Sequence, residues 1–249
     1  MSRFTDSAYL REEQYRDDAN LRARMDPHRR FATNPQPWQR WVFDRLDLPD
    51  EADVLEVGCG PGRLWEENLD RIPDGWRPTL VDLSAGMVER ARAALGERAA
   101  YAVADAQELP FPDERFDAAV ANHMLYHVPD RPRALRELAR VLQPAGRFYC
   151  ATNGGDHLRE IKALFERQSP WEFRLETAAR ELADVFADVT VEVYPSRLEI
   201  TEVEPVVAFV RSMDHGEVEG LEERIRGEIE RAGWFRVTTA TGLLSARKP

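Results

Sequence analysis

The stretch VLEVGCGPG, residues 54–62, decides the fold of this chain. Its apolar residues Val54, Leu55 and Val57 predict a short buried strand. Glycines follow at positions 58, 60 and 62, and the sequence then becomes helical in RLWEENLDRI. Glycines lack a Cβ atom and let a ligand approach the backbone, and the start of a helix offers free N–H groups. The stretch therefore predicts a ligand-binding turn between a strand and a helix.

The spacing of these glycines discriminates between several nucleotide-binding turns. A P-loop needs Gly-Lys-Ser/Thr after its first glycine, and the turn has no such sequence. The dinucleotide motif G-x-G-x-x-G is matched only in part, because Arg63 stands at the third glycine position. The pattern E-x-G-x-G-x-G, from Glu56 to Gly62, resembles the first motif of class I S-adenosylmethionine (SAM)-dependent methyltransferases. The resemblance implies that Glu56, Gly58 and Gly60 hold the amino-acid end of SAM, with S-adenosylhomocysteine as the product. A glycine-rich turn of an unrelated α/β enzyme is the alternative.

Composition narrows the class of protein. The 249 residues carry a formal charge of −11, which disfavours nucleic acid as a partner unless a local basic patch compensates. We identify no signal peptide and no apolar run of the roughly 20 residues that a membrane helix needs, so we expect no membrane insertion. The two cysteines, Cys59 and Cys150, lie in apolar surroundings and favour a reducing, cytoplasmic location.

Apolar runs alternate with helical segments along the chain, which predicts an α/β fold with a doubly wound, mostly parallel sheet. The family resemblance implies a Rossmann-like sheet of seven strands with a helical cap. We expect one domain over 1–249, with lid helices over 1–49, a SAM-binding core over 50–152, a cap with the sixth strand over 153–234 and a terminal strand over 235–249. The expected strands are 53–56, 79–81, 101–104, 116–122, 146–152, 189–194 and 198–201, and the expected helices are 37–47, 63–71, 84–95, 130–142, 153–184, 202–213 and 217–232.

Both ends of the chain have their own signals. Apolar residues recur at helical spacing over residues 6–30, and Pro27 is expected to end that helix. The ending FRVTTATGLLSARK predicts an antiparallel hairpin that turns at Thr241 and Gly242.

Acidic residues stand at the predicted carboxyl ends of strands, where ligands of such sheets bind. Asp82 ends the second strand, 20 residues after Gly62, and is placed to accept hydrogen bonds from two ribose hydroxyls. By the resemblance, Leu83 and Met87 of the following LSAGM segment contact the adenosine part of the cofactor. A turn or helix-capping role is the alternative for Asp82, and core packing is the alternative for Met87.

The segment VADAQELPFPDERFDAAV, residues 103–120, is the second strong signal. It resembles the stretch between the third and fourth strands of the same family. The resemblance implies that Asp105 accepts a hydrogen bond from the adenine amino group and that Ala106 donates one from its backbone. A loop aspartate beside a proline-rich turn is the alternative.

The fourth strand is followed by NHMLYH, residues 122–127, in which Asn122 and His123 are candidate cofactor contacts. DNA and protein-glutamine methyltransferases carry an Asn-Pro-Pro-Tyr motif here, and this chain lacks both prolines. The form resembles small-molecule methyltransferases, including the ubiquinone/menaquinone-type group. A small organic acceptor is therefore expected.

Histidines near the expected methyl group are candidate general bases, because the pKa of an unperturbed imidazole suits proton transfer near neutral pH. His127 is the first candidate, His123 the weaker one and His157 an outside candidate, whereas His28 and His215 are expected at the surface. Helix capping or packing is the alternative for His127.

The flanking regions supply further candidates. Tyr15 or Arg30, on the lid, could bind the methionine carboxylate, with a solvated surface helix as the alternative. Trp171, Phe173 and Phe209 could line the acceptor pocket, and core packing explains them equally well.

The sequence therefore predicts methyl transfer from SAM to oxygen, nitrogen or carbon of a small organic acceptor, in keeping with secondary metabolism, and it indicates no metal. A non-catalytic SAM-binding protein, an RNA or protein methyltransferase and an NAD-dependent oxidoreductase are the alternatives. Homodimer formation is left open.

Overall fold

The computed structural model describes residues 5–10, 14, 18–164, 173–213 and 220–249. Within these ranges no helix combines the length and the apolar character needed to cross a membrane. The helices are α1 (Ser7–Tyr9), α2 (Ala19–Phe31), α3 (Trp38–Phe43), α4 (Arg63–Glu66), α5 (Ala85–Leu95), α6 (Arg131–Val141), α7 (Arg159–Ala163), α8 (Leu175–Ala183), α9 (Glu204–Ser212) and α10 (Leu221–Ala232), with 3-10 helices η3 (Gly96–Arg98) and η4 (Leu125–His127). The strands are β1 (Ala52–Val57), β2 (Trp76–Asp82), β3 (Ala100–Val103), β4 (Phe116–Asn122), β5 (Leu142–Asn153), β6 (Ala187–Val193), β7 (Arg197–Ile200), β8 (Phe235–Thr238) and β9 (Thr241–Arg247).

Seven strands form one sheet in the order β3-β2-β1-β4-β5-β9-β6. The neighbours from β3 to β5 pair in parallel, whereas β9 runs antiparallel to both β5 and β6. This confirms the expected doubly wound, mostly parallel sheet with a reversed last strand. The chain leaves β1 toward β2 on one side and returns to β4 on the other, so a crevice opens at the carboxyl ends of β1 and β4.

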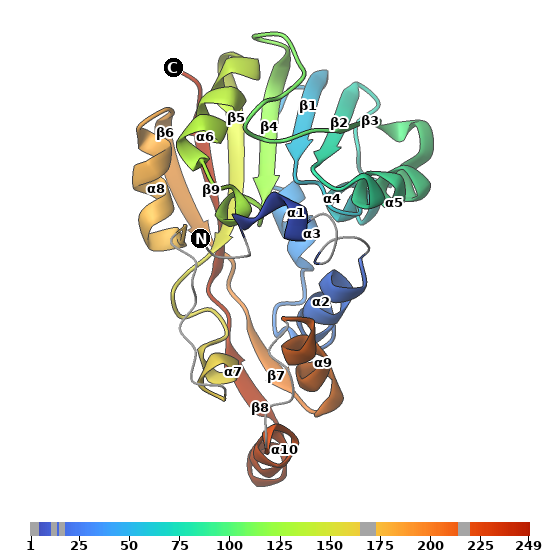
Figure 1. Ribbon diagram of the computed structural model, residues 1–249, viewed down its shortest axis with the longest axis vertical. Helices are drawn as coiled ribbons and strands as arrows, with labels where there is room; N and C mark the ends of the chain where they lie inside the picture. Colours follow the sequence, from blue (N-terminus) through green and yellow to red (C-terminus); the bar gives the residue numbers. More distant parts are fainter. Residues whose placement is uncertain (1–4, 11–13, 15–17, 165–172, 214–219) are drawn as a thin grey trace.

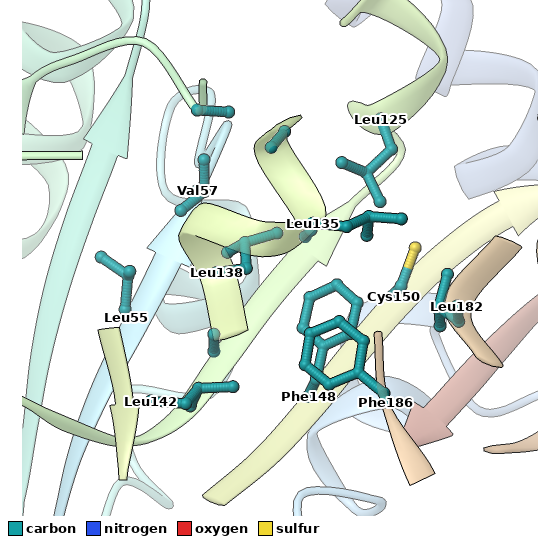
Figure 2. Close-up of a cluster of buried hydrophobic side chains, with 14 of the residues drawn as sticks. Leu55, Val57, Leu125, Leu135, Leu138, Leu142, Phe148, Cys150, Leu182 and Phe186 are labelled. Atoms are coloured by element: carbon teal, nitrogen blue, oxygen red, sulfur yellow. The ribbon is translucent and has the colours of Figure 1, made fainter. Parts of the chain in front are cut away.

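Helices cover both faces of the sheet because its strand residues alternate between two apolar clusters. On β4, Ala119 and Ala121 belong to the cluster under α6 and α8, while Ala118 and Val120 belong to the cluster under α3, α4 and α5. Figure 2 shows the first cluster, where the ring of Phe148 stacks on that of Phe186 with centroids 4.7 Å apart. Period-two alternation is what a sheet buried on both faces requires.

A third apolar cluster lies away from the sheet and builds a cap. It joins α7, α9 and α10 to the antiparallel pair β7–β8. Helix α2 packs on this unit through α9 and β7, and Ala32 forms a β-bridge with Leu198. Figure 1 shows the cap below the sheet, at the edge toward which the arrows of β1, β2 and β4 point. The cap therefore faces the carboxyl ends of the strands.

The C-terminal strands differ from the expected hairpin. Thr241 and Gly242 lie inside β9, not at a turn. Strand β8 pairs with β7 in the cap, and β9 pairs with β5 and β6 in the main sheet. Strand β8 therefore pairs with β7, the strand that follows β6, and not with β9. The alternating apolar residues of β8 complete the cap cluster, whereas those of β9 complete the core of the main sheet.

Three local expectations are also corrected. Pro27 lies inside α2 and does not end it. Proline removes one helical hydrogen bond, but Pro27 is buried, and α2 packs on α9 and β7 of the cap. Regular helix after the glycine turn is confined to Arg63–Glu66, and the segment expected as one helix over 153–184 contains two separate helices, α7 and α8.

Candidate functional site

A cavity of about 1490 Å³ lies between the carboxyl edge of the sheet and the cap. Pockets for a single drug-sized ligand usually measure about 300–1,000 Å³. The cavity therefore has room for two small molecules side by side. Its lining comes from the ends of β1, β2, β4 and β5 on one side and from α2, α7 and α9 on the other.

The glycine turn forms the floor of one end of this cavity. Gly58 and Gly60 have φ angles of 68° and 55°, in the left-handed region that favours glycine. A Cβ atom on Gly58 would lie 2.6 Å from the Cβ atom of Met124, so a side chain has no space there. A Cβ atom on Gly60 would come no closer than 3.8 Å to another residue, that of Leu21, so its place is open to a ligand.

Asp82 fastens the glycine turn to the end of β2. Its Oδ2 accepts a hydrogen bond from the backbone N–H of Gly60 at 2.9 Å, and its Oδ1 accepts one from that of Ser84 at 2.8 Å. Burial raises the pKa of Asp82, against the opposing effect of these bonds. Each carboxylate oxygen has a second lone pair, so Asp82 can still accept two hydrogen bonds from a ligand in the cavity.

Glu56 is the most deeply buried acid of the cavity lining, with 3% of its surface exposed. The indole Nε1–H of Trp65 donates to its Oε2 at 2.8 Å. Burial, and next the charge of Asp82, raise the pKa of Glu56 to about 8. Trp65 and Asn122 lower this pKa only in part. A cation bound beside this carboxyl group would favour its charged form.

Asn122 lies beside Glu56 at the end of β4, and its side-chain amide is buried without a satisfied hydrogen bond. Neither Nδ2 nor Oδ1 has a partner of good geometry among the described residues. Buried polar groups are nearly always hydrogen-bonded, so this amide indicates a polar ligand. An ammonium group next to a carboxylate would fit both Glu56 and Asn122, and the amino-acid end of SAM offers that pair of groups.

The remaining wall of this end is built by the turns after β2 and β3. Met87 and Ala106 are buried and line the cavity together with Leu83. Asp105 also lines it, and its Oδ1 accepts hydrogen bonds from the backbone and side chain of Gln107 at 2.8 and 3.0 Å. The structure thus places most predicted cofactor residues in the lining of one cavity: Glu56, Gly58, Gly60, Asp82, Leu83, Met87, Asp105, Ala106, Asn122 and His123.

The structure describes only one of the two lid residues, Tyr15 and Arg30, that were predicted to bind the methionine carboxylate. Arg30 is not among the cavity-lining residues. Its guanidinium is exposed and donates to Glu202 at 2.5 Å and to Asp26 at 3.4 Å, so the structure places Arg30 outside the cavity, and its contact with the carboxylate stays a prediction. The pattern of α2 could not show that an acid 172 residues later binds this arginine. Tyr15 lies outside the described residues, as do Trp171 and His215.

The other end of the cavity is lined by aromatic and histidine side chains. His28 was expected at the surface, but it lines the cavity and stacks on His157 with ring centroids 5.6 Å apart. Trp38 lies 5.3 Å from the rings of both His123 and Tyr194, and its buried Nε1 has no partner among the described residues. The apolar candidates Phe173 and Phe209 line the cavity as well.

Burial keeps three of the cavity histidines neutral. It lowers the pKa of His28 and of His123 to about 4 and that of His157 well below its ordinary value. The Nδ1 atom of His157 accepts the backbone N–H of Ala240 at 3.2 Å, so the neutral ring carries its proton on Nε2. His157 can therefore donate to a ligand but has no free lone pair to take a proton.

The fourth histidine, His127, ends η4 and also lines the cavity. Its ring lies edge-on to Tyr126 with centroids 4.6 Å apart. Among all the residues that the structure describes, the cavity included, no group of three or more histidine, cysteine or acidic side chains is arranged to hold a metal ion.

Comparison with known proteins agrees with this geometry. The methyltransferase domain family matches residues 55–150. The 27-O-demethylrifamycin SV methyltransferase of Amycolatopsis mediterranei is 32% identical over 240 residues, covering 84% of this chain and 83% of that protein. The ubiquinone/menaquinone biosynthesis C-methyltransferase UbiE of Hahella chejuensis is 33% identical over 116 residues, or 45% of this chain. This second match spans about half of the relative, 47% of its length.

Solved structures support the fold. Phosphoethanolamine N-methyltransferase 2 of Haemonchus contortus, solved in complex with SAM, superposes with a TM-score of 0.62 over 99% of this chain and 60% of that one, at 20% identity. The likeness at this identity concerns the fold alone. Together with the rifamycin methyltransferase match over most of both chains, it leads to one conclusion: the chain belongs to the class I SAM-dependent methyltransferase superfamily.

Proposed function

We propose that this protein transfers a methyl group from SAM to a small organic acceptor. The observation that carries the proposal is the end of the cavity at the glycine turn, where Glu56, Asp82 and the unsatisfied amide of Asn122 surround a backbone that is open to a ligand. A cationic cofactor with a ribose fits this set of groups. The acceptor then occupies the second half of the same cavity.

Each group at the glycine turn has a distinct role in this proposal. Glu56 and Asn122 bind the amino-acid end of the cofactor, and Gly60 lets it lie against the backbone. Asp82 accepts hydrogen bonds from the ribose hydroxyls. Asp105 and Ala106 hold the adenine edge, and Met87 and Leu83 pack against the adenosine part. When bound, SAM supplies a methyl group on a positively charged sulfur, which is open to attack by a nucleophile.

The chain's own contribution to the reaction is alignment, exclusion of water and removal of a proton where the acceptor needs it. His127 is our candidate base. His28 and His123 are poor bases near neutral pH, because burial lowers their pKa to about 4. His157 has its Nδ1 already occupied by Ala240. This leaves His127 as the candidate on which to test proton removal.

The size and the charge of the molecule support a small acceptor. Beyond the space that a cofactor takes, a cavity of about 1490 Å³ leaves room for a ligand of similar size. The net charge of −11 opposes binding to nucleic acid. The relative from Amycolatopsis mediterranei is named for a rifamycin acceptor, which supports a role in secondary metabolism. Cytoplasmic location and homodimer formation stay predictions.

The proposal is tested with labelled SAM and a panel of phenols, amines, carboxylates and thiols. We expect methyl transfer to at least one class, and a loss of about 100-fold or more in turnover for His127→Ala with little change in the affinity for SAM. Binding of SAM and S-adenosylhomocysteine without transfer to any acceptor would favour a non-catalytic SAM-binding protein. Transfer to RNA or protein alone would contradict the small acceptor, and wild-type turnover of His127→Ala would remove its role as a base.

A further inference from the structure

The acceptor end of the cavity contains a cation that forms no ion pair with any carboxylate of the residues that the structure describes. Lys162 lies on α7, lines the cavity and is about half buried. Among the described residues no carboxylate forms an ion pair with its Nζ; Asp156 is close enough to affect it only through its charge, and Asp156 pairs with Arg159 at 3.7 Å. A charge that is partly removed from water without a partner is costly, so the position favours an anion.

The surroundings of Lys162 add positive charge and hydrogen-bond donors. Arg174 also lines the cavity, and its Nη1 lies 3.5 Å from the place of a Cβ atom on Gly155, at the loop that leads from β5 to His157. Lys162 and Arg174 line the same cavity, and burial followed by the charge of Arg174 lowers the pKa of Lys162. His157 carries its proton on Nε2 and can only donate. Lys162, Arg174 and His157 can therefore each donate a hydrogen bond to an anion.

The acids of the cavity lie elsewhere or are already paired. Glu56, Asp82 and Asp105 stand at the cofactor end, on the strands and turns of the sheet. On the cap side, Asp26 lines the cavity but forms ion pairs with Arg29 at 3.2 Å and with Arg30 at 3.4 Å. Glu67, at the end of α4, lies near Arg63. At the loop after β5, the Oε1 of Glu176 accepts the backbone N–H of Gly155 at 3.1 Å, and Glu176 is not part of the lining.

We propose that the methyl acceptor carries a carboxylate, which Lys162 and Arg174 bind and to which the Nε2–H of His157 donates. This inference rests on the proposed function and adds the chemical class of the acceptor to it. The acidic end of the cavity then receives the cationic cofactor, and the basic end receives the anionic acceptor. The opposite charges of the two ligands favour their simultaneous binding, with the nucleophile of the acceptor turned toward the methyl group.

The test compares a carboxylate with its neutral counterpart of the same shape. S-adenosylhomocysteine is first titrated into the protein by calorimetry. The saturated complex is then titrated with 4-hydroxybenzoate and with 4-hydroxybenzamide. We expect 4-hydroxybenzoate to bind about tenfold more tightly than the amide, since a hydrogen-bonded charge is worth more than a neutral one. The difference should shrink at high salt.

Variants separate the role of Lys162 from general effects of charge. Lys162→Met should abolish the preference for the carboxylate, and Lys162→Arg should retain it. Arg211→Met is the control, because Arg211 is an exposed cation of α9 that does not line the cavity. It should leave the preference unchanged. Unchanged affinity of each variant for S-adenosylhomocysteine shows that the cofactor end has stayed intact.

Two outcomes would overturn the inference while leaving the methyltransferase proposal in place. One is equal affinity for the two compounds, or binding of neither, by a protein that binds S-adenosylhomocysteine. The other is a preference for the carboxylate that survives in Lys162→Met. A protein that binds no S-adenosylhomocysteine would instead contradict the cofactor assignment, and the inference with it.

Discussion

The two ends of the cavity are built in different ways. At the cofactor end, the lining residues follow the carboxyl ends of neighbouring strands, which supply the acids Glu56, Asp82 and Asp105; Arg63 of α4 also lines the cavity there. At the acceptor end, the lining comes from the cap, from segments as far apart as His28 and Arg174, and includes cations. The first end is fixed by backbone geometry that the sheet imposes. The second depends on how separate helices pack, so it is the part that can change with the acceptor.

Among substitutions that separate the two ends of the cavity, we expect the largest effect at Gly58. A Cβ atom there would meet the Cβ atom of Met124 at 2.6 Å, and the φ angle of 68° is strained for any other residue. Gly58→Ala should therefore lower the free energy of unfolding by about 3 kcal/mol or more and abolish cofactor binding. Thermal unfolding with and without S-adenosylhomocysteine measures both effects.

Gly233→Ala is the matched control for Gly58. Gly233 has a φ angle of 83° and no atom within 4 Å of its Cβ position. Its replacement should cost only the backbone strain, about 1 kcal/mol, and leave cofactor affinity as it was. Equal losses of stability in the two variants would show that Met124 does not set the requirement for glycine at position 58.

Asp82 tests the acidic character of the cofactor end. Asp82→Asn keeps the shape of the side chain but replaces a charged acceptor, so the affinity for S-adenosylhomocysteine should fall by about 1–3 kcal/mol. Asp74→Asn, at an exposed turn, is the control and should bind as the wild type does. Titration calorimetry gives both values. An unchanged affinity in Asp82→Asn would argue against hydrogen bonds from the ribose.

Glu56 makes cofactor binding depend on pH. Its pKa is about 8 in the free protein, so the carboxyl group is protonated below that pH. A bound ammonium group favours the charged form and requires this proton to leave. Affinity should therefore rise by up to about tenfold per pH unit as the pH increases toward 8, and then level off.

The release of a proton is measured directly by calorimetry in buffers of different ionisation enthalpy. Glu56→Gln should lose both the release and the pH dependence. Glu67→Gln should keep them, since Glu67 lies in the same cavity but near Arg63. Proton release that persists in Glu56→Gln would assign the titration to another group.

Arg30 should have the smallest effect. It is exposed, is bound to Glu202 and Asp26 and lies outside the lining. We expect Arg30→Ala to bind S-adenosylhomocysteine with wild-type affinity. A clear loss of affinity in the same titration would show that the lid brings Arg30 to the methionine carboxylate when the cofactor binds.

The contrast between the two ends also explains what the sequence could predict. The strand over 116–122 has the predicted bounds, and the helix predicted over 84–95 begins at its N-cap Ser84, whose Oγ accepts the backbone N–H of Met87 at 3.4 Å. These features depend on local patterns of apolar residues, glycine and capping groups. The same patterns place Glu56, Asp82 and Asn122 at the carboxyl ends of strands, and the family resemblance, not the patterns, suggested their contacts with the cofactor.

Most residues of the acceptor end could not be predicted from the sequence. His28, Trp38 and Lys162 carry no motif, and they reach the cavity only through the packing of the separate helices α2, α3 and α7. The pairing of β8 with β7 was missed for the same reason, since a nearby turn-like Thr-Gly pair suggested a local hairpin. Long-range pairing of this kind is decided by which cluster each strand completes. No single segment of the sequence contains that information.

A structure of the protein with bound S-adenosylhomocysteine tests the central claim most directly. The account predicts the ribose hydroxyls within hydrogen-bond distance of Asp82, the α-ammonium group beside Glu56 and Asn122, and the sulfur facing the cap. A ligand whose amino-acid end lies at Lys162, or whose ribose makes no contact with Asp82, would contradict it.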